Sequence, residues 1–343
     1  MTRRLRWGVL GTGKIANHFV GDLQIIGAPV SAVGSRDLQR ARLFAESHGI
    51  PHAHGSYDDL VADATVDVVY VATPNTSHAA DALLALNAGK NVLVEKPFAL
   101  NATEAQEVVD LAAERDLVVL EAMWTRWLPH MVRIRELVRS GVLGDIRTVM
   151  ADHGQSLPHD PTHRVLSPAL GGGALLDLGV YPISFAWDLL GQPDRVLAMA
   201  DAAATGVDAV TSVILGFASG AQAVSQSALH ARSPITASVS GTEARVEIDS
   251  FWYFPSSFTL IRADGEVLER FDGGVQGRGM QFQAMELERL VEDGVLSGEI
   301  MPPQQSVAIM ATLDEVRRQI GLVFPSKTAA VERSAADVVG VQG

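Results

Sequence analysis

Three residues in this chain carry side chains that could move a proton next to a carbon undergoing oxidation. Lys96 stands in Glu95-Lys96-Pro97, and Asp177 and Tyr181 lie four residues apart in one apolar segment. A free tyrosine, with a pKa of about 10, is a poor base at neutral pH, but a nearby ammonium favours the phenolate. We therefore predict that Tyr181 is the acid/base, that Lys96 lowers its pKa and holds a substrate hydroxyl, and that Asp177 accepts an orienting hydrogen bond.

Lys96 follows a short apolar strand, residues 91–94. Ligands of open α/β sheets bind at the carboxyl ends of the strands, which is where this lysine falls. Pro97 has no N–H and disfavours helical angles at the residue before it, so the chain must turn at Lys96. Taken alone, Glu-Lys-Pro fits a surface loop equally well.

Asp177 and Tyr181 follow the run Gly171-Gly172-Gly173. The apolar residues up to Gly191 have helical spacing, which places both side chains on one helix face. Pro182 cannot donate to the Leu178 carbonyl, so a kink is expected there. Without other evidence, such a pair on a core helix is usually a satisfied polar pair with no catalytic role.

A glycine pattern near the N-terminus predicts a dinucleotide site. Gly11-Thr12-Gly13-Lys14-Ile15-Ala16 follows an apolar strand, residues 6–10, and opens a helix. The first glycine permits a tight turn, the second lets the backbone approach a pyrophosphate, and the helix N-terminus faces the phosphates. The alternative is a turn with a structural role only.

The second strand, residues 30–33, ends at Gly34-Ser35-Arg36, where an NAD enzyme usually carries an acid for the ribose 2′-hydroxyl. Ser35 and Arg36 suit a 2′-phosphate instead, so NADP is favoured, with NAD as the second possibility. The alternative is that Arg36 lies in solvent at the strand end, with Asp37 blunting its charge.

Further site residues are expected after later strands of the first half. The remaining predicted cofactor contacts are Thr73, Pro74, Asn75, Glu95 and Lys96. Trp124, Arg126 and Arg164 are candidates for a sugar or polyol pocket, together with Asp177 and Tyr181, since aromatic faces and guanidinium groups suit such ligands. For the first three, ordinary packing and solvated charge are the alternatives.

The order of predicted elements indicates two α/β domains. Alternating strands and helices over residues 1–125 predict a Rossmann domain with a doubly wound parallel sheet. Residues 126–335 contain a succession of strands, which predicts a large, mainly antiparallel open sheet. Gln222 and Gln226 alternate with small or apolar residues there, so one face is available for self-association or is plainly solvent-exposed. The predicted strands are 146–150, 195–200, 209–217, 221–229, 235–240, 244–248, 258–261 and 267–271.

Composition excludes several classes of protein. The chain has 343 residues, 47% of them hydrophobic and 20% charged, which describes an ordinary globular protein. We identify no apolar run of about 18 residues and no signal peptide, so no membrane partner is expected. No cysteine is present, which excludes thiol and disulfide chemistry and agrees with a cytoplasmic location. The net charge of −13 argues against general nucleic-acid binding.

The glycine loop, Glu95-Lys96-Pro97 and the segment from Gly171 to Tyr181, in this order, resemble the glucose-fructose oxidoreductase and inositol dehydrogenase family (Gfo/Idh/MocA). Residues 121–126 and 164–170 further resemble its dimeric dihydrodiol dehydrogenase and NADP-dependent D-xylose dehydrogenase branch. The resemblance implies a homodimer formed through the open sheet, and it matches Lys96, Tyr181 and Asp177 to the family's catalytic motif. Inositol dehydrogenases carry histidine where Tyr181 stands, so a cyclitol substrate is disfavoured.

These observations predict an NAD(P)-dependent oxidoreductase acting on a sugar, polyol or cyclic diol. The alternative is a catalytically silent regulator on the same fold, although such a protein could dispense with Lys96 or Tyr181. His153, His159 and His163 raise the question of a metal, but prolines interrupt their spacing and the reaction requires none.

Overall fold

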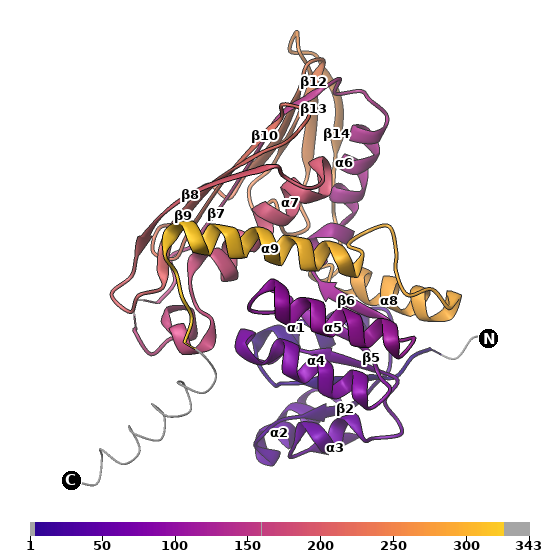
Figure 1. Cartoon of the computed structure of the whole chain (residues 1–343). Coiled ribbons are helices and arrows are strands. Elements are labelled where there is room, and N and C mark those ends of the chain that lie inside the picture. Colours follow the sequence, from indigo (N-terminus) through magenta and orange to yellow (C-terminus); the bar gives the residue numbers. More distant parts are fainter. Residues whose placement is uncertain (1–3, 159, 326–343) are drawn as a thin grey trace.

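The computed structural model describes residues 4–158 and 160–325, which form two sheets with helices packed on and between them (Figure 1). The six-stranded sheet has the order β3-β2-β1-β4-β5-β6 and is parallel throughout. Its strands are β1 (Trp7–Leu10), β2 (Val30–Gly34), β3 (His52–His54), β4 (Val68–Val71), β5 (Asn91–Glu95) and β6 (Val119–Ala122). The prediction of a doubly wound parallel sheet is confirmed.

The central strands of this sheet are buried on both faces, which explains their almost continuous apolar sequences. The helices that connect the strands are α1 (Lys14–Ile25), α2 (Leu38–His48), α3 (Tyr57–Val61), α4 (His78–Asn87) and α5 (Ala102–Glu114). Side chains fix where several of them begin: Asp37 accepts from the first turn of α2, and Asn101 accepts from the Glu104 N–H in α5. Strands and caps together direct the carboxyl ends of β1, β4 and β5 to one edge.

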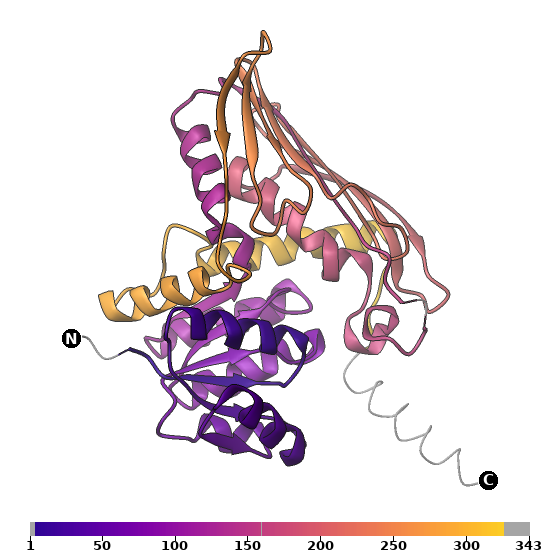
Figure 2. The ribbon, with the colours of Figure 1, turned by 180° about the vertical axis from the view of Figure 1, so that it is seen from behind.

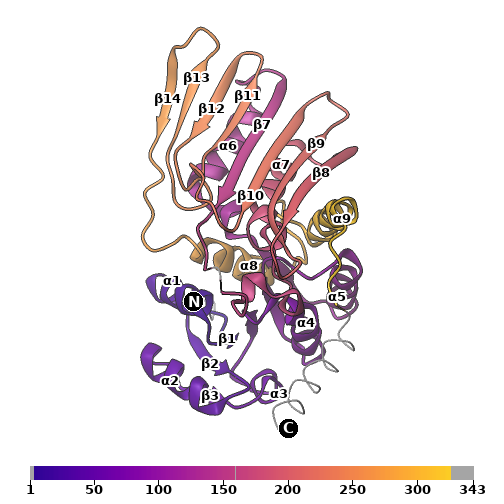
Figure 3. The ribbon, with the colours of Figure 1, turned by 90° about the vertical axis from the view of Figure 1, so that its left-hand side faces the viewer.

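The eight-stranded sheet has the order β14-β13-β12-β11-β7-β10-β9-β8. All neighbouring pairs are antiparallel except β7 and β10, which confirms the mainly antiparallel prediction. Its strands are β7 (Ile146–Gly154), β8 (Arg195–Ala202), β9 (Asp208–Gly216), β10 (Gln222–Ala228), β11 (Ala237–Gly241), β12 (Ala244–Ile248), β13 (Phe258–Arg262) and β14 (Val267–Phe271). Helices α6 (Pro129–Arg139) and α7 (Val180–Leu190) lie behind this sheet in Figure 3, and no labelled helix stands in front of it.

The last two helices return to the first sheet. In Figures 1 and 2, α8 (Gln281–Asp293) and α9 (Pro303–Ile320) lie between the two sheets. Helix α9 packs against α5 and β8, and α8 packs against α1. A domain division at residue 125 remains our proposal, and the predicted end of the second domain at residue 335 lies outside the described residues.

The segment Pro168–Leu190 is long and apolar enough to span a membrane by length and by a mean hydropathy of 1.3 over an 18-residue stretch within it, which corrects the expectation of no such stretch in the chain. In the fold, 89% of that 18-residue stretch is buried inside the protein. Its apolar character is therefore explained by packing under the second sheet, as in the core helix of a globular protein.

Candidate active site

Lys96 and Tyr181 meet where the two halves of the protein face each other. Lys96 follows the carboxyl end of β5, and Tyr181 lies in the first turn of α7. The Lys96 Nζ is 4.8 Å from the centroid of the Tyr181 ring, and it donates a hydrogen bond of 2.7 Å to the Asp177 carbonyl oxygen. The structure thus brings together the three residues predicted to do the chemistry.

A proline helps to leave that carbonyl available to Lys96. Residues Leu175–Gly179 form a π-helical turn, η5, that runs directly into α7. In a π-helical register, the carbonyl of residue 177 faces residue 182, and Pro182 has no N–H to donate. The irregularity expected at Pro182 therefore lies one turn earlier. The Lys96 ammonium donates to the Asp177 carbonyl, which the helix leaves without a hydrogen bond of its own.

Asp177 is ionised and held by charged neighbours. Its Oδ1 accepts a hydrogen bond of 2.8 Å from Arg164 Nη1. Burial acts to raise the pKa of this carboxyl, but the charges of Lys96 and Arg164 outweigh it and hold the pKa below the ordinary value. Arg164 is half-exposed at its side chain, so it can turn toward a ligand while remaining near the carboxylate.

The Tyr181 hydroxyl accepts a hydrogen bond of 3.1 Å from Trp124 Nε1. Burial, followed by the negative charge of Glu95, raises the pKa of Tyr181 well above 10, while Trp124 and Arg278 act in the opposite direction. The predicted lowering by Lys96 is therefore wrong for this structure, because the ammonium lies over the ring and burial dominates. Tyr181 is a protonated phenol here, suited to giving a proton to a carbonyl oxygen.

An aromatic wall of His153, Tyr253, Phe254 and Trp124 lies beside Tyr181, and the sequence did not predict these residues as a group. The His153 ring centroid lies 5.2 Å from that of Tyr181 and 4.1 Å from that of Tyr253, and the Phe254 centroid lies 5.0 Å from that of Trp124. Burial and then Lys96 lower the pKa of His153 to about 3, so its imidazole is neutral. No spacing pattern connects residues so distant in sequence, so only the fold reveals that they share a site.

Arg126 lines a small cavity together with Tyr181, but its guanidinium is engaged within the protein, and its contact with a substrate stays a prediction. Its side chain is 3% exposed, and it donates to Ser184 Oγ, to the Ser184 carbonyl and to Asp188 Oδ1 at 3.0, 2.7 and 2.9 Å. Arg135 Nη1 holds the other Asp188 oxygen at 2.6 Å. These contacts make Arg126 part of a buried ion-pair network between η2 (Trp124–Trp127), α6 and α7.

The loop after β1 fits a dinucleotide pyrophosphate. Gly11 has φ +103°, and a Cβ there would lie 2.5 Å from the Ala72 carbonyl oxygen. Gly13 is the N-cap of α1 and faces open space, and no side chain or first-turn acid caps the helix. The backbone N–H groups at the N-terminus of α1, around Thr12, Lys14 and Ile15, can therefore bind an anion. Nearby, the buried Thr73 Oγ1 has no hydrogen-bond partner among the described residues, as a group awaiting a ligand would.

Ser35 and Arg36 lie at the carboxyl end of β2, where the ribose of a dinucleotide would bind. Asp37 caps α2, where its Oδ1 accepts from the Gln39 and Arg40 N–H groups at 2.9 and 3.2 Å, and among the described residues it forms no ion pair with Arg36. The Arg36 guanidinium lies beside the Tyr57 hydroxyl and is exposed. This pattern fits a 2′-phosphate.

Two other predicted cofactor residues support the frame of the site. Asn75 follows Pro74, the N-cap of η1 (Asn75–Ser77), and its Nδ2 donates to the Gly171 carbonyl at 3.1 Å. The Glu95 carboxylate points into the first domain, where its Oε1 accepts from the Tyr70 hydroxyl at 2.5 Å and its Oε2 from the Lys96 N–H at 3.1 Å. Both side chains are engaged within the protein, and their contact with a dinucleotide stays a prediction.

His78 ties the two loops of the site together. Its Nδ1 lies 2.7 Å from the Pro97 carbonyl oxygen, and its Nε2 lies 2.9 Å from the Thr73 carbonyl oxygen. His78 is also the first residue of α4. Its buried imidazole between two carbonyls links the loop after β4 to the turn that carries Lys96.

The histidines considered for a metal are not grouped as ligands. His163 caps a short helical turn over Arg164–Leu166, His153 lies in the aromatic wall, and His159 is outside the described residues. Within the described part of the chain, the group with ligand-like geometry is His52, His54 and Asp63, where one Asp63 oxygen lies 2.7 and 3.0 Å from the two imidazoles. These residues belong to β3 and the loop after α3, and none of them contacts Lys96 or Tyr181.

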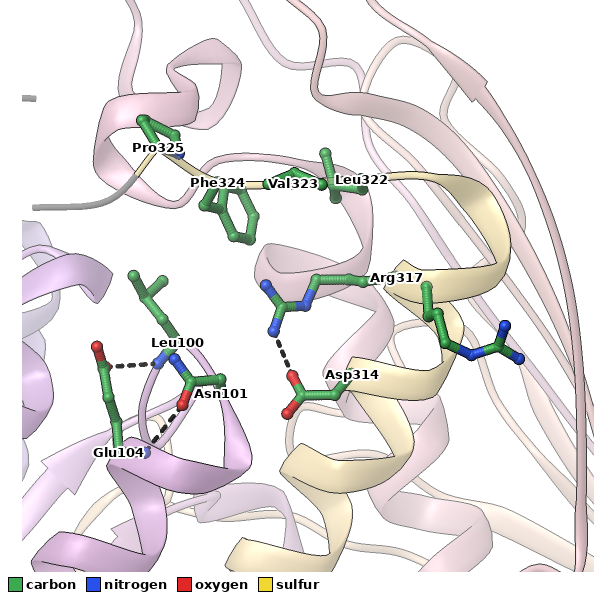
Figure 4. A pocket seen from close by; sticks show the side chains of 10 residues that line it. Leu100, Asn101, Glu104, Asp314, Arg317, Leu322, Val323, Phe324 and Pro325 are labelled. Carbon is green, nitrogen blue, oxygen red and sulfur yellow. Dashed lines mark hydrogen bonds and ion pairs between the residues drawn. The ribbon is translucent and has the colours of Figure 1, made fainter. Parts of the chain in front are cut away.

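A cavity of about 370 Å³ lies elsewhere, between the start of α5 and the end of α9 (Figure 4). Leu100 and Asn101 form one side of it, and Arg317 and Phe324 lie across from them. Arg317 points toward Asp314, with which it makes an ion pair. Lys96, Asp177 and Tyr181 do not line this cavity, so it is separate from the site described above.

The fold and the site define a two-domain oxidoreductase with an NAD(P)-binding Rossmann domain. Comparison with protein families agrees: a model described as "Oxidoreductase family, NAD-binding Rossmann fold" matches residues 5–123, and the "GFO/IDH/MocA C-terminal domain" matches residues 131–247. The chain belongs to the Gfo/Idh/MocA family, which confirms the resemblance read from its motifs.

Similar proteins include two dihydrodiol dehydrogenases. The trans-1,2-dihydrobenzene-1,2-diol dehydrogenase of Macaca fascicularis is 36% identical over 333 residues, covering 94% of this chain and 98% of that protein. The Homo sapiens protein of the same name is 35% identical over 336 residues, with the same coverage. The expected similarity to the dihydrodiol dehydrogenase branch is thus confirmed.

Solved structures show the same fold. The 3-ketoreductase KijD10 from Actinomadura kijaniata, in complex with NADP and TDP-benzene, has a TM-score of 0.83 at 26% identity, covering 93% of this chain and 98% of that one. The aldose-aldose oxidoreductase from Caulobacter crescentus, complexed with glycerol, has a TM-score of 0.84 at 26% identity, covering 92% and 97%.

Proposed function

We propose that this protein transfers a hydride between C4 of a nicotinamide and a carbinol or carbonyl carbon of a sugar, polyol or cyclic diol. The observation that carries the proposal is the placement of the Lys96 ammonium 4.8 Å from the Tyr181 ring, with the Asp177 carbonyl fixing the ammonium. Relatives named as dihydrodiol dehydrogenases and an aldose oxidoreductase support this range of substrates.

When bound, a reduced nicotinamide would supply the hydride that the carbonyl carbon receives in the reductive direction. The Tyr181 hydroxyl gives its proton to the carbonyl oxygen, and Lys96 stabilises the developing oxyanion. In the oxidative direction, Tyr181 first loses its hydroxyl proton to solvent, the resulting phenolate takes the carbinol O–H proton, and the C–H hydride would leave to the nicotinamide. The raised pKa of Tyr181 favours the proton-donating role, and the Trp124 N–H steadies the oxygen in either direction.

We propose NADP as the preferred cofactor. Support comes from the exposed Arg36, whose neighbour Asp37 is committed to capping α2, and from the NADP complexes of KijD10. The proposal assigns Gly11, Gly13 and the N-terminus of α1 to the pyrophosphate, and Ser35 and Arg36 to the 2′-phosphate. A cytoplasmic location stays a prediction.

We also propose that the open face of the second sheet makes a homodimer. Leu197, Ile214, Val224 and Met150 are consecutive cross-strand partners on β8, β9, β10 and β7. The first, second and fourth are 64%, 42% and 51% exposed, and Met199 on β8 is 74% exposed. A contiguous apolar row of this kind is typical of a surface that another subunit covers.

The assay that tests the function follows NADPH absorbance at 340 nm while the protein and NADP are mixed with pentoses, hexoses, hexuronates and trans-dihydrobenzenediol. We expect turnover with at least one substrate and a lower KM for NADP than for NAD. Tight NADP binding without turnover on any substrate would instead favour the regulator, and no binding of either dinucleotide would refute both readings.

A further inference from the structure

Arg278 lies in the connection between β14 and α8, and its backbone is clamped from both sides. Its N–H lies 3.1 Å from each Asp22 oxygen, and the Met280 N–H donates to the same carboxylate at 2.8 Å. Gly277 and Gly279 have φ values of +75° and +86°, and a Cβ on either would collide with Asp22 or Leu128. This backbone fixes the direction in which the Arg278 side chain leaves the chain.

The side chain reaches the aromatic wall of the active site. The Arg278 Cζ is 4.3 Å from the Phe254 ring centroid and 5.9 Å from that of Trp124. Trp124 in turn donates to the Tyr181 hydroxyl. The positive charge of Arg278 acts to lower the pKa of both Tyr181 and Tyr253, which places it within electrostatic reach of the acid/base.

In the described part of the chain, Arg278 differs from the other arginines near the site because no carboxylate forms an ion pair with its guanidinium. Arg126 and Arg164 have carboxylate oxygens at 2.9 and 2.8 Å. Among the described residues, the buried Arg278 Nε has no acceptor, and Asp22 is engaged by backbone N–H groups. Stacking on an aromatic ring covers the flat face of a guanidinium and leaves its in-plane N–H donors free, and these donors match a carboxylate bidentately.

The charges around Tyr181 also favour a negatively charged ligand. Lys96, Arg164 and Arg278 supply three positive charges. Of the nearby acids, Asp177 is paired with Arg164, and Glu95 accepts from Tyr70 on the side of the first domain. A substrate carboxylate would therefore enter a region with a surplus of positive charge, where the guanidinium N–H donors of Arg278 are free to bind it.

Resting on the proposed function, we propose that Arg278 binds a carboxylate on the substrate, so that the preferred substrates are sugar acids of the hexuronate class. Aromatic rings of Trp124 and Phe254 cover apolar faces of the sugar ring, and Tyr181 and Lys96 act on its carbinol carbon. A cofactor phosphate is the competing anion, because Arg278 also influences His18 on α1.

The test compares Arg278→Gln and Arg278→Lys with the wild type on matched pairs, D-galacturonate against D-galactose and D-glucuronate against D-glucose. We expect kcat/KM of the wild type to favour a uronate by at least about tenfold. Arg278→Gln should lose about 30- to 100-fold for the uronate, mainly through KM, and less than about threefold for the hexose. The kcat/KM of Arg278→Lys for the uronate should lie between those of the wild type and Arg278→Gln, because lysine keeps the positive charge but lacks the paired, planar N–H donors.

Arg289→Gln on α8 is the matched control, because that arginine pairs with Glu286 and Asp293 at the surface and should behave like the wild type. Calorimetric titration of the NADP complex with D-galacturonate gives the same comparison without turnover. Equal losses for uronate and hexose, or no uronate preference in the wild type, would overturn the inference. A weakened NADP affinity in Arg278→Gln would assign the guanidinium to the cofactor instead.

The two proposals can fail separately. Turnover of neutral hexoses or of trans-dihydrobenzenediol without a uronate preference would leave the oxidoreductase function standing and remove the role of Arg278. Binding of D-galacturonate that depends on Arg278, with no NADPH formed from any substrate, would keep the carboxylate site and refute the proposed reaction.

Discussion

The Lys96 ammonium donates a hydrogen bond of 2.7 Å to the carbonyl oxygen of Asp177, a residue that lies 81 positions further along the chain. This bond joins the end of β5 in the first sheet to the π-helical turn before α7. It positions the ammonium over the Tyr181 ring and uses one of its three N–H donors, so the others remain for a substrate oxygen.

Replacing Lys96 by Met should therefore remove the charge that stabilises an oxyanion while leaving the dinucleotide loop intact. We expect kcat to fall by about 10²- to 10⁴-fold, with the Kd for NADP changing less than about threefold. Lys90→Met is the matched control: Lys90 Nζ also donates to backbone carbonyls, those of Asp63 and Val66, but away from the site. Stopped-flow turnover and fluorescence titration with NADP measure the two effects. A Lys96→Met protein as active as Lys90→Met would show that the lysine does not assist the reaction.

Much of the fold follows from local patterns. Buried parallel strands have unbroken apolar sequences, and the glycine loop before α1 and Gly191 after α7 each mark a helix end by local chemistry. Lys96, Asp177 and Tyr181 can be predicted as site residues for the same reason, because each lies in a short segment with a distinctive sequence.

The rest of the site depends on contacts between segments far apart in the chain. Arg126 and Arg164 look alike as residues, and only packing places one in a buried ion-pair network and leaves the other half-exposed beside Asp177. Similarly, Tyr253 and Arg278 enter the site through the second sheet and the connection to α8. The sign of the Tyr181 pKa change could not be predicted either, because burial is a property of the folded chain.

The contrast between these two arginines gives a second prediction. Arg126→Met should lower the free energy of unfolding by about 3 kcal/mol, because it leaves the buried Asp188 with one partner fewer. Arg164→Met should lower the free energy of unfolding by less than about 1 kcal/mol, because the Arg164 side chain is 57% exposed. It should, however, raise the KM for the substrate. Urea denaturation and steady-state kinetics on both variants test this. A normal stability with a raised KM in Arg126→Met would restore its predicted role in the substrate pocket.

Cofactor choice is predicted to depend on Arg36. Arg36→Ala removes the guanidinium expected to hold the 2′-phosphate, so the KM for NADP should rise by about 10- to 100-fold while the KM for NAD changes little. Arg40→Ala, on the exposed first turn of α2, is the neighbouring control. Equal changes for the two cofactors would show that Arg36 does not read the 2′-phosphate.

Stability should fall as the pH rises through neutrality, because Glu95 and Glu121 are buried carboxyls. Burial raises the pKa of Glu121 from 4.5 to about 7, and its Oε1 accepts from the Phe98 N–H in the turn after Lys96. Between pH 4.5 and about pH 7, Glu121 is protonated in the folded state and ionised in the unfolded state. The stabilisation is therefore greatest at low pH and disappears as the pH rises through about 7, by at most about 3 kcal/mol per carboxyl.

Glu121→Gln should keep the hydrogen bond to Phe98 and remove this titration. We expect the melting temperature of the wild type to drop between pH 5.5 and pH 8.5, and that of Glu121→Gln to drop less, with the remainder due to Glu95. Thermal scans at the two pH values decide the point. Identical drops in both proteins would mean that Glu121 is ionised in the folded state throughout this range.

The open face of the second sheet gives the last prediction. Met199 is 74% exposed on β8, next to the apolar row formed by Leu197 and Ile214. If two subunits pair through this face, Met199→Arg buries an unpaired charge from each of them, and the dimer Kd should rise at least about 100-fold. Leu43→Arg on α2 is the control, because Leu43 is 59% exposed but belongs to the first domain. Light scattering after size exclusion should give twice the chain mass for the wild type and for Leu43→Arg, and a single chain for Met199→Arg. A monomeric wild type would refute the dimer, and a Met199→Arg dimer would move the interface to another surface.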